Sequence, residues 1–271
     1  MRGQVRYLTF LNMLSVFLLA LSGLFGGALG KAVYVLSFAL PFSIGVSLFK
    51  KVDASPLKFH TGRVDLRLSL PLVFPIILLI FGVSALTSLV LGIFGFNDST
   101  ELSGSVISII FNHALMPSLL EEAFFRFIPL AFLKGRSKRA AIILSSVFFA
   151  FAHCNLFQLP YAFLAGVCFA LVDIAFDSII PSLTIHFLNN TLSIFWMLYG
   201  DTLGVYFVLG LVLLAILSFV FVWIYRTRYA EIFKGALAKG EKINLSYELV
   251  IFIVMTAFVA FTNLFSSLEG V

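Results

Sequence analysis

The sequence contains little charge and little cysteine. Only 11% of its 271 residues are charged, against about 25% in an average soluble domain. Its two cysteines, Cys154 and Cys168, do not form a C-x-x-C motif. The scarcity of charge excludes a soluble globular enzyme, and it also excludes a disordered protein, which combines low hydrophobicity with high charge. The scarcity of cysteine excludes a disulfide-stapled secreted module.

Long apolar runs take the place of charge. Hydrophobic residues make up 61% of the chain, and its mean hydropathy is +1.09. A membrane-spanning helix needs about 20 mostly apolar residues, whereas a membrane β-barrel shows alternating segments of about ten. The runs here are continuous, and nine qualify as spans: residues 8–29, 32–49, 69–95, 104–133, 138–156, 158–176, 179–198, 203–225 and 247–266.

These runs predict an all-α polytopic membrane protein, a bundle of about 8–9 transmembrane helices. The longest loops, residues 50–68 and 226–246, are too short for a soluble domain. We therefore expect a single membrane domain over residues 1–271.

The basic residues predict a cytoplasmic N-terminus. With that orientation and nine spans, 16 of the 18 Lys and Arg residues lie in cytoplasmic segments, as the positive-inside rule requires. They are Arg2, Arg6, Lys50, Lys51, Lys58, Arg63, Arg67, Lys134, Arg136, Lys138, Arg139, Arg226, Arg228, Lys234, Lys239 and Lys242. The net charge of +5 is thus explained by topology, with the lipid bilayer as the expected partner and no role for nucleic acid.

Polar side chains occur inside three of the predicted spans. Ionisable groups in mid-membrane are costly and indicate function by default. At about 1.5 Å of rise per helical residue, their depths overlap, which predicts one polar cavity near mid-membrane. They are Glu121, Glu122 and Arg126 in the fourth span, His153 in the fifth, and His186, Asn189 and Asn190 in the seventh.

Spacing predicts how the acidic cluster is arranged. Glu122 and Arg126 are separated by four residues, so a salt bridge between them is expected and would let both stay buried. Such a pair is also common as a purely structural contact. Glu121 points about 100° away and needs another partner. Pro117, one turn earlier, removes a backbone hydrogen bond and is expected to bend the helix.

The same four-residue spacing recurs on the other two spans. It places His186 and Asn190 on one helix face, and it places the Phe149 ring against His153. Asn189 is interpreted as a helix–helix contact.

Two further sets of polar residues receive structural interpretations. Asn112 and His113 are interpreted as interhelical hydrogen-bonding residues. Asp173 and Asp177 flank the inner end of the sixth span, where water is expected to be near.

These residue types fit peptide hydrolysis. Amide hydrolysis needs an activated water, a proton shuttle and donors for the developing oxyanion. No G-x-S-x-G motif supports serine chemistry, and no H-E-x-x-H motif supports a zincin. Two histidines and a glutamate could nevertheless hold zinc with an open fourth position, so a divalent metal on Glu121, His153 and His186 stays open.

The motifs resemble those of the CPBP family, also called Abi, which includes type II CAAX prenyl endopeptidases and bacteriocin-processing or immunity proteins. Glu121 to Arg126 fits E-E-x-x-x-R, Phe149 to His153 fits F-x-x-x-H, and His186 to Asn190 fits H-x-x-x-N. The motif-bearing core is expected at about residues 104–198. Two features depart from the family pattern: Phe127 stands where a glycine commonly follows the arginine, and the family core is associated with eight spans.

The resemblance implies an intramembrane endopeptidase, located as a multi-pass protein in a prokaryotic cell membrane. Glu121 would activate water with help from His153, and His186 and Asn190 would stabilise the oxyanion. Glu122 and Arg126 would hold the site together, with Glu122 orienting His153. The substrate would be a membrane protein or a lipidated peptide, and no cofactor other than a divalent metal is implied.

Two other functions compete with proteolysis. One is a non-proteolytic membrane scaffold or a bacteriocin-immunity protein on the same fold, although such a protein would not need every polar position intact. The other is a transporter or channel, which would show paired interrupted helices in corresponding halves of the chain, and no such pair is found.

Overall fold

The fold is all-helical. The computed structural model describes residues 1–57, 66–96, 102–238, 240–242 and 246–266, and that part of the chain contains no strand. In its first part the helices are α1 (Arg2–Ser22), α2 (Gly27–Ser47), α3 (Phe49–Val52), α4 (Leu66–Ser69), η2 (Leu70–Leu72) and α5 (Val73–Ile93). The central helices are α6 (Val106–Ile110), η3 (Phe111–Leu115), α7 (Met116–Glu121), η4 (Glu122–Phe127), α8 (Ile128–Leu133) and α9 (Lys138–Ala152). They are followed by α10 (Leu159–Phe176), α11 (Ile180–Ile224), α12 (Arg226–Ala236) and α13 (Tyr247–Ser266).

Six helices in the described part of the chain are long and apolar enough to cross a membrane. They are α1, α2, the stretch Arg67–Ile93, α10, α11 and α13. Together with the absence of strands, they confirm the predicted class, a polytopic helical membrane protein. The predicted fourth and fifth spans do not count as long helices, because residues 106–133 are divided into short elements and α9 has 15 residues. The number of nine spans and the single membrane domain therefore stay predictions.

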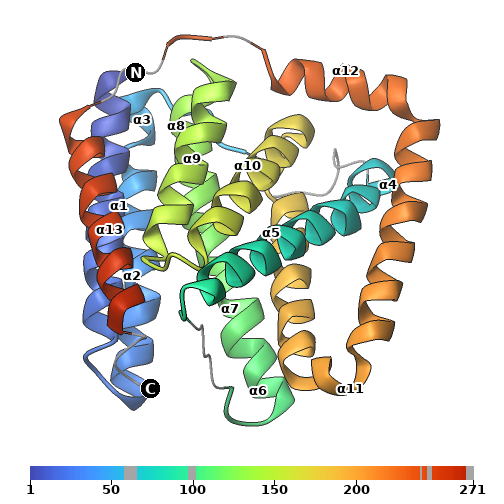
Figure 1. The fold of residues 1–271 in the computed structure, drawn as a ribbon. Helices are drawn as coiled ribbons and strands as arrows, with labels where there is room; N and C mark the ends of the chain where they lie inside the picture. The colour runs from blue at the N-terminus through green and yellow to red at the C-terminus, as the bar shows by residue number, and fades with distance from the viewer. Residues whose placement is uncertain (58–65, 97–101, 239, 243–245, 267–271) are drawn as a thin grey trace.

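The positively charged segments gather at one end of the bundle. Figure 1 shows the start of α1, α3, α4 and α12 at this end, with the lower end of α13 at the other. Ion pairs tie the segments together there: Glu241 pairs with Arg136 at 3.4 Å and with the N-terminal amine at 3.8 Å, and Arg6 pairs with Glu248 at 3.0 Å. The basic segments therefore lie at the same end of the bundle, and the cytoplasmic location of that end stays a prediction.

The first helix lies earlier in the chain than predicted. It runs over Arg2–Ser22, whereas hydropathy placed the first span at residues 8–29. The basic end is helical because long arginine side chains can keep their charge in water while their stems cover apolar surface. The turn falls at Gly23 to Gly27, and Gly27 has a φ of +60°, which suits glycine.

Helix α11 combines two predicted spans. The predicted spans 179–198 and 203–225 both fall within α11, a continuous helix of 45 residues that turns back on itself in Figure 1. The rings of Trp196 and Phe207 lie 5.8 Å apart, although eleven residues of straight helix would separate them by about 16 Å. Gly200 and Gly204 lie under the Trp196 ring, where an added Cβ would meet it at 3.4 and 3.3 Å. The two arms of α11 therefore run in opposite directions.

The segment 106–133 is the central helical stretch, and its second half is buried. All residues from Phe124 to Leu133 are buried, and several join the large core cluster. Close helix packing surrounds this stretch. A Cβ on Gly45 would meet the Ile128 side chain at 2.9 Å, and one on Gly166 would lie 2.9 Å from the Ser146 Cα atom. Small residues thus let α2 approach α8 and let α10 approach α9, as is usual for membrane helices.

Candidate active site

The site begins with a change of helix type. The stretch 106–133 contains two π-helical segments, η3 and η4, and η4 carries Glu122 and Arg126. Single π turns inside α-helices are rare and frequently mark functional sites. Each segment ends two residues before a proline, Pro117 or Pro129. Since a proline ring clashes with the carbonyl four residues earlier, the prolines give a physical cause for the widened turns.

A carbonyl released in η4 is used by the neighbouring groups. Phe125 stands four residues before Pro129, and its carbonyl oxygen accepts from the Ser145 hydroxyl at 2.7 Å. It also accepts from Arg126 Nη1 at 3.4 Å. The π segment is thereby joined to α9 beside the charged pair.

The predicted pair of Glu122 and Arg126 is confirmed. Arg126 Nε lies 3.5 Å from Glu122 Oε2, and both side chains are about 1% exposed or less. The guanidinium also lies over two aromatic rings, 4.2 Å from the centroid of Phe149 and 5.6 Å from that of Phe169. Cation–π contacts of this kind are attractive and are stronger where water is excluded.

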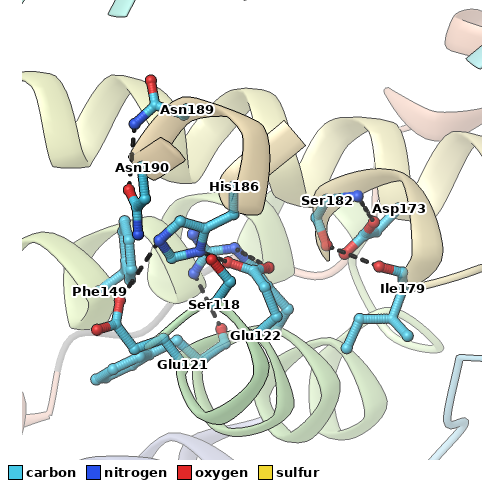
Figure 2. A network of polar contacts seen from close by, with 12 residues as sticks. Ser118, Glu121, Glu122, Phe149, Asp173, Ile179, Ser182, His186, Asn189 and Asn190 are labelled. Atoms are coloured by element: carbon cyan, nitrogen blue, oxygen red, sulfur yellow. Dashed lines mark hydrogen bonds and ion pairs between the residues drawn. The ribbon is translucent and has the colours of Figure 1, made fainter. Parts of the chain in front are cut away.

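His186 lies between the two glutamates. Its Nδ1 atom is 2.8 Å from Glu122 Oε1, and its Nε2 atom is 3.8 Å from Glu121 Oε2 (Figure 2). The first distance is a hydrogen bond, in which the carboxylate accepts the Nδ1 proton. The second is too long for a direct hydrogen bond but within ion-pair distance, which makes His186 the partner that Glu121 is expected to need. Glu122 therefore orients His186, and the expectation that it orients His153 is wrong.

Asn190 and Asn189 lie one turn beyond His186. Asn189 Nδ2 is 3.4 Å from Asn190 Oδ1, so the Asn190 oxygen accepts and its NH₂ group stays available to donate. Figure 2 shows the Asn190 amide on the side of His186 that faces Glu121. Asn189 is 9% exposed, and its Oδ1 atom has no hydrogen-bond partner within the described residues.

His153 directly follows the last residue of α9, and its side chain hydrogen-bonds to the backbone of that helix. Its Nδ1 atom lies 2.7 Å from the Phe149 carbonyl oxygen. A carbonyl can only accept, so Nδ1 carries the proton and Nε2 presents a lone pair. The Phe149 ring packs edge-on against His153 at 4.8 Å, as predicted, and against His186 at 5.7 Å. No hydrogen bond or ion pair joins His153 to Glu121 in the described part of the chain.

The predicted metal ligands do not form a metal-binding group. Glu121 and His186 are neighbours, but the structure groups no three His, Cys, Asp or Glu side chains at metal-binding spacing among the residues it describes. The Nδ1 atoms of both histidines are already committed, one to Glu122 and one to a carbonyl, so only their Nε2 atoms are left to bind a metal. In the described part of the chain, Glu121, His153 and His186 do not lie at the spacing that a bound ion needs.

Three residues at the site lie outside the predicted set. Phe169 of α10 is 1% exposed and packs against His186 at 5.5 Å. Tyr34 of α2 interacts electrostatically with Glu121. The Ser118 hydroxyl is buried one turn before Glu122 and donates to the Ala114 carbonyl. No spacing signal points to Phe169 or Tyr34, because both come from otherwise ordinary apolar spans.

Asp173 was expected near water, and this prediction is wrong. Its side chain is 0% exposed. Helix α10 continues three residues further to Phe176, which packs with Leu68 and Tyr229, and the Tyr229 hydroxyl donates to the Leu68 carbonyl at 2.7 Å. The inner end of α10 is thereby covered by α12 and by the start of the Arg67–Ile93 stretch.

Fold and site together define a helical membrane protein with a buried glutamate–histidine–asparagine cluster. Residues 103–192 match the family model described as type II CAAX prenyl endopeptidase Rce1-like, and this stretch contains every predicted site residue. The match covers about a third of the chain, agrees with the family that the motifs resemble, and supports a membrane protease. No curated protein and no solved structure matches the chain.

Proposed function

We propose that the protein is an intramembrane endopeptidase that uses glutamate-activated water. One observation carries the proposal: His186 lies between two glutamates, hydrogen-bonded to Glu122 at 2.8 Å and facing Glu121 at 3.8 Å. Glu121, Glu122 and His186, three of the residues implied by the family resemblance, lie together in a largely buried setting. Of the two glutamates, Glu121 is 14% exposed and Glu122 is 1% exposed, so Glu121 is the one that substrate and water can reach.

Glu121 acts as the general base. A water molecule that hydrogen-bonds to the Glu121 carboxylate would lie beside His186 Nε2, because these two side-chain atoms are 3.8 Å apart. Glu121 takes a proton from this water, and the hydroxyl oxygen attacks the carbonyl carbon of the scissile peptide bond. General base catalysis of this kind contributes roughly 10²- to 10⁴-fold in rate.

His186 and Asn190 stabilise the oxyanion. In its protonated form His186 donates Nδ1–H to Glu122 and directs Nε2–H toward the developing charge. The Asn190 NH₂ group, whose orientation follows from the bond accepted by its oxygen, supplies a second donor. Donors fixed before the reaction cost no reorganisation when the charge appears.

The proton then goes to the leaving group. When the tetrahedral intermediate breaks its C–N bond, the amine nitrogen receives the proton that Glu121 took up. The His153 Nε2 atom has a lone pair because its Nδ1–H is bonded to the Phe149 carbonyl, so His153 can relay this proton. The products are a carboxylic acid and an amine, and no step requires a metal.

The substrate is a membrane-embedded protein segment. An apolar groove of about 280 Å³ lies beside the site, between the 106–133 stretch and α11. It is lined by Leu115, Leu119, Leu183, Thr184, Phe187 and Leu188. Leu119 and Phe187 belong to the two helical stretches that carry Glu121 and His186, so an apolar chain in this groove would lie against both of these elements.

A comparison of protein termini tests the proposal. Host membranes containing the wild type, Glu121→Gln or Glu231→Gln at equal levels are analysed for new N- and C-termini. Glu231 lies on the exposed face of α12, so its variant is a matched loss of one carboxylate. We expect termini that are present with the wild type and Glu231→Gln and absent with Glu121→Gln.

Two results would contradict the proposal. One is an identical set of termini in all three samples with every protein folded, which would favour the scaffold or immunity function. The other is full cleavage by Glu121→Gln. Treating purified protein with a chelator decides the metal question separately: metal-free catalysis by Glu121 predicts unchanged cleavage.

A further inference from the structure

Asp173 is a buried ionisable residue that the proposed reaction does not use. Its backbone carbonyl accepts from the N–H groups of Asp177 and Ser178, which end α10 and begin the turn to α11. Its side-chain Oδ1 atom accepts from the Ser182 N–H at 3.1 Å. One residue therefore binds the end of α10, the turn and the first turn of α11.

The first turn of α11 needs this contact. The N–H groups that begin a helix have no partner inside it and must bond elsewhere. The residue before the helix, Ile179, is apolar and cannot cap it, and Pro181 has no N–H. The Ile180 N–H reaches a serine hydroxyl in the turn at 3.2 Å. Asp173 supplies the cap for Ser182 from a neighbouring helix.

Ser182 stands one helical turn before His186. Residues four apart share a helix face, so a fixed Ser182 fixes the direction of His186 toward Glu122. Figure 2 shows the Asp173–Ser182 contact beside His186, on the side away from Asn190. Asp173 also interacts electrostatically with Glu122 and Arg126, the ion pair that holds His186.

We propose that Asp173 is a positioning residue that, by capping α11 at Ser182, fixes the rotation of the face carrying His186 and Asn190. The effect on the rate rests on the proposed function, whereas the effect on the helix does not. The carboxylate touches no reacting atom in this scheme. The helix is positioned by the hydrogen bond that the Asp173 side-chain oxygen accepts from Ser182, and ionisation of Asp173 is secondary for this role.

The test separates the hydrogen-bond acceptor from the ionisable group. Asp173→Asn keeps an oxygen that can accept from Ser182 and removes the ionisable carboxyl group, while Asp173→Leu removes both at similar size. Asp177→Asn is the matched control, because it removes an exposed carboxylate from the same turn and keeps a side chain that tolerates a positive φ. Each variant is measured for kcat and KM, and for amide hydrogen exchange in peptides covering residues 179–190.

We expect Asp173→Leu to lower kcat about 10- to 100-fold, as a small misplacement of reacting groups does, with KM changed by less than about threefold. Exchange should speed up over residues 182–186. Asp173→Asn should keep kcat within about threefold of the wild type and retain the slow exchange, as should Asp177→Asn. If Asp173→Leu does not fold, Asp173→Ala replaces it.

Three outcomes would overturn the proposal: Asp173→Asn as impaired as Asp173→Leu, an unchanged kcat in Asp173→Leu, or unchanged exchange in that variant. Hydrogen exchange also separates this proposal from the proposed function. If the wild type cleaves nothing, the proteolytic function fails, and faster exchange in Asp173→Leu with protection in Asp173→Asn still supports the cap.

Discussion

The two π-helical segments of the central stretch have the same backbone form and opposite surroundings. Both η3 and η4 precede a proline by two residues. In η4 the side chains of Glu122 and Arg126 are buried and paired with each other, with His186 and with aromatic rings. In η3 the His113 side chain is exposed and makes no hydrogen bond or ion pair with the described residues. A widened turn therefore does not make a site unless other helices supply partners.

Removing the positive charge of Arg126 in η4 should have the largest effect, which is a loss of folding stability. Arg126→Met leaves Glu122 buried without its arginine, and breaking one partner of a buried pair costs about 3–5 kcal/mol. Unfolding titrations in detergent should show this loss. The double variant Glu122→Gln with Arg126→Met should lose less, because no unpaired charge remains.

The exposed pair of Arg136 and Glu241 is the matched control for this loss. Its side chains are 44% and 50% exposed, so Arg136→Met should cost at most about 1 kcal/mol. If Arg126→Met and Arg136→Met lower the free energy of unfolding equally, burial does not make one ion pair more important for stability than the other.

The next largest effect is expected at Asn189 and Asn190, the two asparagines of α11 that face η4. Their alanine variants should lower kcat by different amounts. Asn190→Ala should lower kcat about 10²- to 10³-fold, as losing one oxyanion donor does. Asn189→Ala should lower it only a few-fold, because Asn189 acts by orienting its neighbour through a long bond of 3.4 Å. Single-turnover cleavage assays on the two variants make the comparison, and equal losses would contradict the assigned roles.

Leu119, between the two π segments, should affect substrate binding. It lines the apolar groove and is 43% exposed, so Leu119→Trp should fill part of the groove and raise KM about tenfold with little change in kcat. Leu79→Trp, on the lipid-facing side of α5, is the control. A drop in kcat with normal KM would place Leu119 in the chemistry and outside substrate binding.

The smallest effect is expected in η3. His113→Ala should change stability by less than about 0.5 kcal/mol, as surface substitutions usually do, and should leave cleavage unchanged. Unfolding and cleavage assays check both values. A large loss of activity would show that η3 is also part of the site and would remove the contrast between the segments.

Much of the site could be predicted because it rests on local spacing. The pair of Glu122 and Arg126 and the stacking of Phe149 on His153 follow from residues four apart on one helix. The family motifs added His186 and Asn190. The contact between Glu122 and His186 spans 64 residues, and no local rule indicates it, so the assignment of Glu122 to His153 failed.

The fold was predictable in class and less so in detail. Hydropathy located the apolar stretches, but it misplaced α1 because a helix can extend through its charged end. The sequence also predicted that Asp173 lies near water, because its position near the end of one helix does not reveal that other helices cover this end. The π segments could have been anticipated: Pro117 and Pro129 were visible, and a bend was expected at the first of them.

The bend in α11 gives the protein a spectroscopic reporter of its own. The chain has two tryptophans: Trp196 lies in the bend against Phe207 and two glycines, while Trp223 is 69% exposed near the other end of the helix. A Trp223→Phe variant leaves one emitter at the point where the arms meet. Its fluorescence then follows the separation of the two arms, and with it the position of the arm that carries His186, without any added label.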